Sequence, residues 1–124
     1  MVKYEDITIE VGFWSGDKTR RVEEVNFRGR LLACTKCLGE ENEYDDWGIK
    51  WAIYQTEEGT YIVYWFEWYA CYGNKVMADY AILDTLPDYN QSINGIMWGS
   101  YFNTIPDNVI DKAKAALLAH YHEA

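Results

Sequence analysis

The chain has 124 residues, a formal net charge of −9 and an aromatic content of 17%. This length fits one domain over residues 1–124, and the composition supports a core without disulfides or metal and argues against long disorder. The acidic excess disfavours direct binding to nucleic acid and favours a partner with a basic surface.

The N-terminal part is expected to form two strands. Residues 4–13 alternate between apolar and polar side chains, which indicates a half-buried strand. After a turn at residues 15–18, the segment 20–33 predicts a second strand, in which Gly29 would mark a bulge. The polar residues 39–46 that follow predict a loop.

Three further strands are expected in the middle of the chain, at residues 49–56, 61–71 and 75–84, where aromatic and β-branched residues are frequent. The turns between them fall at residues 57–60 and at 73–74, and Gly-Asn at the second turn is typical of a two-residue hairpin loop. Each of these strands should therefore pair antiparallel with the next.

The C-terminal part predicts a helix after an ambiguous segment at 87–103, which suits a loop with a short helix. Pro106 fits the first turn of the helix. Apolar residues then recur at helical spacing, at Val109, Ile110, Ala113, Leu117 and Tyr121. The predicted fold class is α+β, an antiparallel β-sheet of about five strands in hairpins, packed with a C-terminal α-helix.

Turn lengths predict which side chains share a face of the sheet. A two-residue loop at 73–74, and a loop of two or four residues in the first hairpin, would place Glu67 opposite both Tyr80 and Lys50. The face covered by the helix would then carry Trp51, Ile53, Ile62, Tyr64, Phe66, Trp68, Ala81 and Leu83. The opposite face would carry Lys50, Tyr54, Tyr61, Val63, Trp65, Glu67, Tyr69, Tyr80 and Ile82.

This second face, rich in tyrosine, has two interpretations. The first two strands or the 87–103 segment cover it as a second layer, or it is an exposed surface for a dimer or a partner protein. Tyrosine and tryptophan combine apolar area with a polar tip, so they are frequent where proteins bind partners. The face therefore belongs among the candidate binding sites.

A cluster of carboxylates in the predicted loop is a second candidate site. Its residues are Glu40, Glu41, Glu43, Asp45 and Asp46, with the aromatic side chains of Tyr44 and Trp47 among them. The carboxylates would imitate phosphates and pair with arginines of a partner. A hard-cation site and a plain solvated loop are the alternatives, and the EF-hand spacing is absent.

Cysteines offer a third candidate, because Cys34 and Cys37 have the C-x-x-C spacing of zinc ligands and of redox pairs. Cys71 with His120 or His122 would have to complete a zinc site. The second half of the usual zinc signature is missing, so the favoured interpretation is reduced, half-buried cysteines, with neither metal nor cofactor expected.

The expected function is non-enzymatic binding, since no phosphate loop, nucleophile elbow, dinucleotide glycine pattern or H-E-x-x-H occurs. The hypothesis is a small acidic inhibitor or adaptor that docks a basic surface of a larger protein. A nucleic-acid-handling or defence enzyme is the expected host, by analogy with phage and plasmid anti-defence proteins or immunity proteins. The predicted partner-binding residues are the carboxylate cluster with Tyr44 and Trp47, together with Tyr54, Tyr61, Trp65, Glu67, Tyr69 and Tyr80.

The alternative is a small-molecule-binding domain. Its aromatic sheet face and Arg28 or Arg30 would hold a nucleotide-like anion. The N-terminus does not resemble a signal peptide, and the longest strongly apolar stretch, 61–66, is too short to span a membrane, so a cytoplasmic location is expected. The sequence is also compatible with a homodimer.

Overall fold

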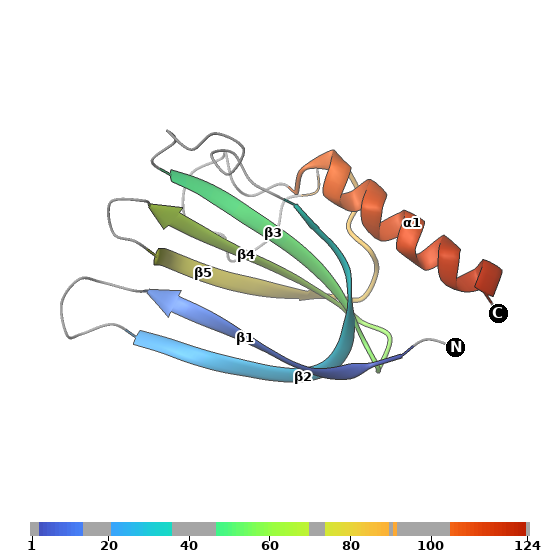
Figure 1. Cartoon of the computed structure of the whole chain (residues 1–124), viewed down its shortest axis with the longest axis horizontal. Helices are drawn as coiled ribbons and strands as arrows, with labels where there is room; N and C mark the ends of the chain where they lie inside the picture. The colour runs from blue at the N-terminus through green and yellow to red at the C-terminus, as the bar shows by residue number, and fades with distance from the viewer. Residues whose placement is uncertain are drawn as a thin grey trace.

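The computed structural model describes residues 3–13, 21–35, 47–69, 74–89, 91 and 105–123. Figure 1 shows the elements of this part of the chain, which are β1 (Glu5–Phe13), β2 (Arg21–Thr35), β3 (Trp47–Thr56), β4 (Tyr61–Tyr69), β5 (Asn74–Leu83) and α1 (Asp107–Glu123). Each strand pairs antiparallel with the next. This confirms the predicted α+β class with an antiparallel sheet and a C-terminal helix.

The sheet also closes on itself, which was not predicted. β1 pairs with β5 through Gly12 with Ala78 and Phe13 with Met77, so the strands form a small barrel in the order β1-β2-β3-β4-β5. The closure depends on β2, whose first half pairs with β1 and whose second half pairs with β3. A long strand shared in this way must bend between its two partners.

Gly29 lies where β2 passes from one partner to the other. It is opposite Glu5 of β1 and also opposite Thr56 of β3. A Cβ atom at this position would lie 2.5 Å from the backbone oxygen of Gln55, so glycine is required by close approach. The bulge expected here lies instead just beyond, between Leu31 and Ala33.

The turn between β3 and β4 explains why the predicted register was wrong. The N–H of Thr56 donates to the carbonyl oxygen of Thr60 at 2.8 Å, which encloses a three-residue loop, and Gly59 in this loop has φ of 98°. The predicted register assumed a loop of two or four residues. The odd length shifts the register by one residue, so Lys50 is opposite Phe66 and not opposite Glu67.

The register between β4 and β5 was also predicted wrongly. Tyr69 pairs with Asn74, so residues 70–73 connect the strands in place of the two-residue loop. A further register shift between Glu67 and Trp68 places Glu67 opposite Met77 and not opposite Tyr80. Because side chains alternate along a strand, β4 presents to each layer the residues that were assigned to the other.

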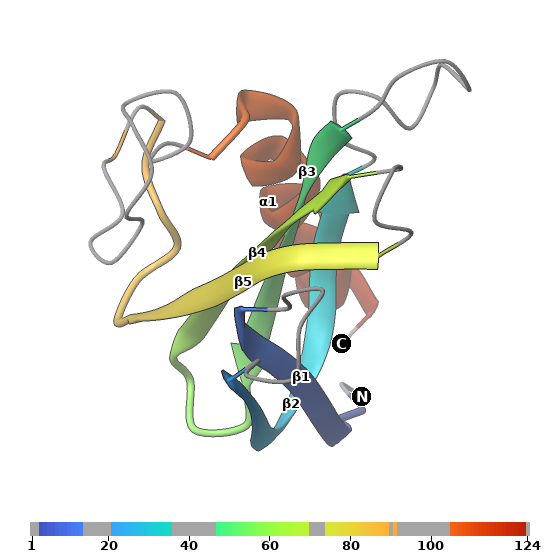
Figure 2. The same ribbon diagram turned by 90° about the vertical axis from the view of Figure 1, so that its left-hand side faces the viewer.

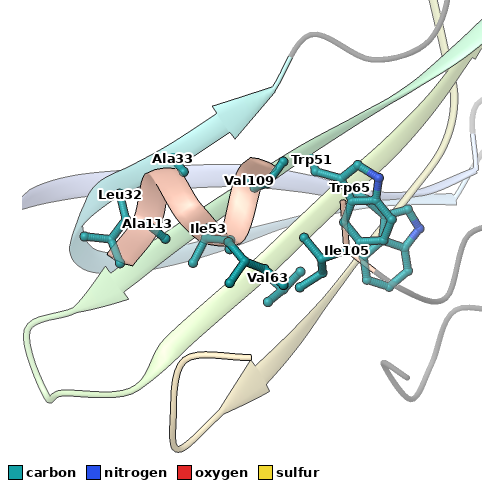
Figure 3. Close-up of a cluster of buried hydrophobic side chains, with 10 residues drawn as sticks. Leu32, Ala33, Trp51, Ile53, Val63, Trp65, Ile105, Val109 and Ala113 are labelled. Carbon is teal, nitrogen blue, oxygen red and sulfur yellow. The ribbon is translucent and has the colours of Figure 1, made fainter. Parts of the chain in front are cut away.

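One core cluster lies between α1 and the outer face of the barrel (Figure 3). Ala33, Ile53, Val63 and Ala81 form one row across β2 to β5, because each is opposite the next. The helix residues that bury completely in this cluster are Val109, Ile110 and Ala113. The predicted apolar face of the helix is confirmed at these positions. Leu117 packs at the edge of the cluster, and the side chain of Tyr121 lies outside the described residues.

Strands β3 and β5 present the predicted residues to α1, and β4 does not. Those confirmed on this side are Trp51, Ile53, Ala81 and Leu83. The β4 residues on this side are Tyr61, Val63 and Trp65, in place of Ile62, Tyr64 and Phe66. The side chain of Trp68 lies outside the described residues. The predicted division of β4 between the two faces was therefore reversed.

A second cluster fills the barrel interior. Its buried members are Ile9, Val11, Ala52, Ile62, Tyr64 and Ala78, and half-buried Ile7, Val25, Phe27, Tyr54, Phe66 and Tyr80 pack against them. In Figure 2, β1 lies in front of β3 and β4 while α1 lies behind them. The first two strands thus cover the inner face of the central sheet, which confirms the interpretation that they form a second layer. No helix among the described residues is long and apolar enough to cross a membrane.

Candidate functional site

The predicted acidic loop falls outside the described residues. Glu40, Glu41, Glu43, Tyr44, Asp45 and Asp46 all belong to that part of the chain. Trp47 begins β3, while Glu67 and Tyr69 lie in β4, but their side chains are likewise outside the described set. Binding through these side chains therefore stays a prediction.

The remaining residues of the predicted Tyr/Trp surface are divided between two cores. Trp65 is 1% exposed and packs beside Trp51 on the helix side, with ring centroids 5.8 Å apart, and Tyr61 lies at the margin of the same cluster. Tyr54 and Tyr80 are half-buried in the barrel interior. Of the two interpretations of this face, the exposed one does not hold for these four residues, because β4 is turned over and β1 and β2 cover the interior side.

Two tyrosines of the interior have altered acidity. The Tyr64 hydroxyl donates to the carbonyl oxygen of Glu10 at 2.8 Å and so ties β4 to β1. Burial, with smaller contributions from Tyr54 and Glu10, raises the pKa of Tyr64 to about 12. Burial and then the nearby Cys34 raise the pKa of Tyr54. Both phenols are therefore protonated at neutral pH, where they act as hydrogen-bonding parts of the core.

Arg28 joins three segments at one end of the barrel. Its Nε donates to Oε2 of Glu57 at 2.8 Å, its Nη1 to Oδ1 of Asp6 at 3.2 Å, and its Nη2 to the carbonyl oxygen of Tyr4 at 3.2 Å. These bonds to Glu57 and Asp6 raise the pKa of Arg28. The alternative hypothesis assigns an anionic ligand to Arg28 or Arg30, and the guanidinium of Arg28 is already paired with two carboxylates.

Arg30 has a different partner, since its Nε donates to Oε1 of Gln55 at 3.0 Å. The aromatic face that would complete a nucleotide site is packed against β1 and β2. No described feature therefore favours the small-molecule alternative over the protein-binding one.

An acidic surface that the sequence analysis did not identify lies on the outside of the β1–β2 hairpin. Ile9 and Val11 point into the barrel, so Thr8 and Glu10 point outward. Across the hairpin, Glu10 is directly opposite Glu24, and Thr8 is opposite Asn26, to which it is hydrogen bonded. All four outward side chains are exposed. We call these four residues, Thr8, Glu10, Glu24 and Asn26, the acidic hairpin face.

Among the side chains that the structure describes, none supplies a compensating charge to the two glutamates of the acidic hairpin face. Like charges directly opposite each other destabilise a pair of strands. Arg28 forms ion pairs with Asp6 and Glu57, and within the described part of the chain no cation pairs with Glu10 or Glu24. Alternation along residues 4–13 placed Glu10 outside, but Glu24 could be placed beside it only once the hairpin register was known.

The cysteine hypothesis is tested only in part, because Cys37 and Cys71 lie outside the described residues. Cys34 is an exposed free thiol on β2. Among the residues that the structure describes, no group of three or more metal-ligating side chains occurs. Comparisons of the chain with protein-family models, with curated proteins and with solved structures gave no match.

Proposed function

We propose that the protein is a small acidic binding protein that docks a basic surface of a larger protein through the acidic hairpin face. The observation that carries the proposal is the exposed pair Glu10 and Glu24, directly opposite each other without a cation among the described residues. A guanidinium or ammonium group of a partner would relieve their repulsion on docking. The surface thus gains more from a cationic partner than two separated carboxylates would.

Long-range electrostatics support the same proposal. The net charge of −9 attracts a basic partner before contact and speeds the encounter. Arginine is the favoured partner side chain, because its planar fork can donate to two carboxylate oxygens at once. A site that normally holds the phosphates of a nucleic acid has this chemistry, so an enzyme that acts on nucleic acid is the proposed host. Residues 40–46 would add carboxylates to the same interaction.

The test compares two charge-reversed variants in parallel pull-downs against the wild type, with partners identified by mass spectrometry. Glu10→Lys with Glu24→Lys should lose a partner that the wild type retains. Glu58→Lys with Asp88→Lys changes the net charge equally, at exposed positions off the acidic hairpin face, and should keep that partner. Equal loss in both variants would show that only total charge matters. Retention by the first variant would exclude the hairpin surface.

A further inference from the structure

The outer edge of β5 continues well past the point where the barrel closes. β1 pairs with β5 only at Gly12 with Ala78 and at Phe13 with Met77. Figure 2 shows the two strands diverging from this contact, β5 toward its end at Leu83 and β1 back toward the N-terminus. In the portion of the chain that the structure describes, residues 79–83 pair with β4 alone. Among the described strands, none therefore pairs with this stretch of the β5 edge.

A free edge displays peptide groups that can pair with another strand. On this one, the N–H of Tyr80 donates at 2.8 Å to Oδ1 of its neighbour Asp79. That bond occupies a backbone donor of the edge strand, and a charged residue in this role is a common protection against indiscriminate pairing. The carboxylate of Asp79 thus blocks one backbone donor of the edge, and a cation that pairs with Asp79 would release this donor.

An exposed apolar side chain lies on the same five residues. Ile82 is 61% exposed, although its cross-strand neighbour Ile62 is buried in the barrel interior. Further across the same row, Ile62 is opposite Tyr54. The interior cluster therefore reaches the surface at the β5 edge, where a strand laid alongside would cover Ile82.

We infer that the β5 edge, Asp79–Leu83, accepts an extended basic segment of the partner as an added antiparallel or parallel strand. This inference rests on the proposed function, from which the basic partner comes. It adds that one segment of the partner binds as an extended strand. Peptide groups of the segment pair with the edge, an apolar side chain covers Ile82, and a lysine or arginine pairs with Asp79 or with the exposed Asp84 at the end of the strand.

Charge decides between this occupant and a second copy of the chain. A second copy would bring the same net charge of −9 and would place its own Asp79 and Asp84 beside the first pair. A basic segment instead supplies the opposite charge at the same edge. A homodimer through β5 is therefore the disfavoured occupant.

The test uses a short synthetic peptide of alternating lysine and valine with blocked ends, added to the isotope-labelled full chain and followed by NMR. The amide signals of residues 79–83 should shift in a saturable way. Methylating alternate peptide nitrogens keeps the charge but removes strand pairing, and it should weaken binding roughly tenfold or more, as expected for one or two lost hydrogen bonds. Equal binding of the methylated peptide, or no binding at all, would overturn the inference.

Two substitutions that leave the charge unchanged test whether the peptide binds at the β5 edge or at another exposed apolar surface. Ile82→Ser should weaken binding of the lysine–valine peptide by roughly threefold to tenfold, because apolar contact is lost without a change in charge. Leu118→Ser is the matched control, since Leu118 is 59% exposed on α1, a helix that contacts mainly β2, and it should leave binding unchanged. Equal effects of the two substitutions would also overturn the inference.

The same titration distinguishes this inference from the proposed function. If shifts appear at residues 8–10 and 24–26 and vanish with Glu10→Lys and Glu24→Lys, while residues 79–83 stay unmoved, the acidic hairpin face stands and the β5 edge fails. If residues 79–83 shift and the charge-reversed variant binds the peptide almost as well, the edge stands and the hairpin proposal fails.

Discussion

Tyr64 links the two layers of the barrel through one polar atom in an apolar interior. Its ring packs in the interior cluster, and its hydroxyl spans from β4 to the backbone of β1. Burial of a phenol costs little while the hydroxyl is bonded and neutral, but a buried phenolate would lack solvation. The residue therefore makes folding sensitive to high pH.

We predict a loss of stability between pH 10 and about 12, the ordinary and the folded-state pKa values of Tyr64. Because the folded state holds the proton more tightly, the stabilisation is complete below pH 10 and declines as pH rises toward the folded-state pKa. A shift of this size corresponds to roughly 2–3 kcal/mol of unfolding free energy. Urea unfolding across this pH range measures it.

Tyr64→Phe is the control for that prediction. At neutral pH it should cost about 1 kcal/mol, because the carbonyl of Glu10 loses its hydrogen bond. Above pH 10 its unfolding free energy should fall less steeply than that of the wild type, with the remaining slope due in part to Tyr54, whose pKa is also raised. Parallel slopes would mean that other groups govern the high-pH transition.

At the level of elements, β2 is the strand on which barrel closure depends. It serves β1 and β3 in succession and changes partner at Gly29. The approach of the Gln55 backbone oxygen leaves no room for a side chain there. Residues on both sides of this glycine also contribute to different layers, since Phe27 faces the interior and Leu32 packs under α1.

Gly29→Ala should therefore destabilise the protein by about 1–3 kcal/mol, the usual cost of forcing atoms into a filled site. The clash is with backbone, so β2 and β3 must separate locally, and hydrogen exchange should accelerate at Glu5 and Thr56, the two residues opposite Gly29. Gly59→Ala is the comparison, because Gly59 has open space but φ of 98°. It should lower stability without faster exchange at Glu5. A neutral Gly29→Ala variant would contradict the close approach.

At the level of the whole molecule, the negative charge lowers the stability of the free protein and favours binding of a basic partner. At a net charge of −9, the carboxylates repel one another in the folded state. Glu10 and Glu24, directly opposite each other, concentrate that repulsion on one surface. The acidic hairpin face is thus expected to cost stability in the free protein. The proposed basic partner would remove this cost.

Glu24→Lys should raise the unfolding free energy on the order of 0.5 kcal/mol at low salt, because a repulsive cross-strand pair becomes an attractive one. The gain should shrink as salt is added, since the screening length falls from about 10 Å at 0.1 M to about 3 Å at 1 M. Denaturant unfolding at two salt concentrations checks both statements. A variant less stable than the wild type at low salt would show that Glu24 has a stabilising partner.

Local pattern was enough to predict where the elements begin and end. The alternation at residues 4–13 marked β1, the polar turn at 57–60 separated β3 from β4, and Pro106 with the apolar spacing after it marked α1. These signals depend on residues only a few positions apart, so they predict secondary structure without knowledge of the fold. They established the antiparallel α+β class but neither its register nor its closure.

Tertiary structure alone decided which face of the sheet the β4 side chains occupy. The odd length of the loop that ends at Gly59 places Trp65, which was predicted on a binding surface, in the core beneath α1. Barrel closure at Gly12 and Ala78, and the meeting of Glu10 with Glu24, likewise join residues far apart in the chain. Alternation with period two predicts that successive side chains lie on opposite faces of a strand. Which face is buried depends on strand pairing and on the packing of layers.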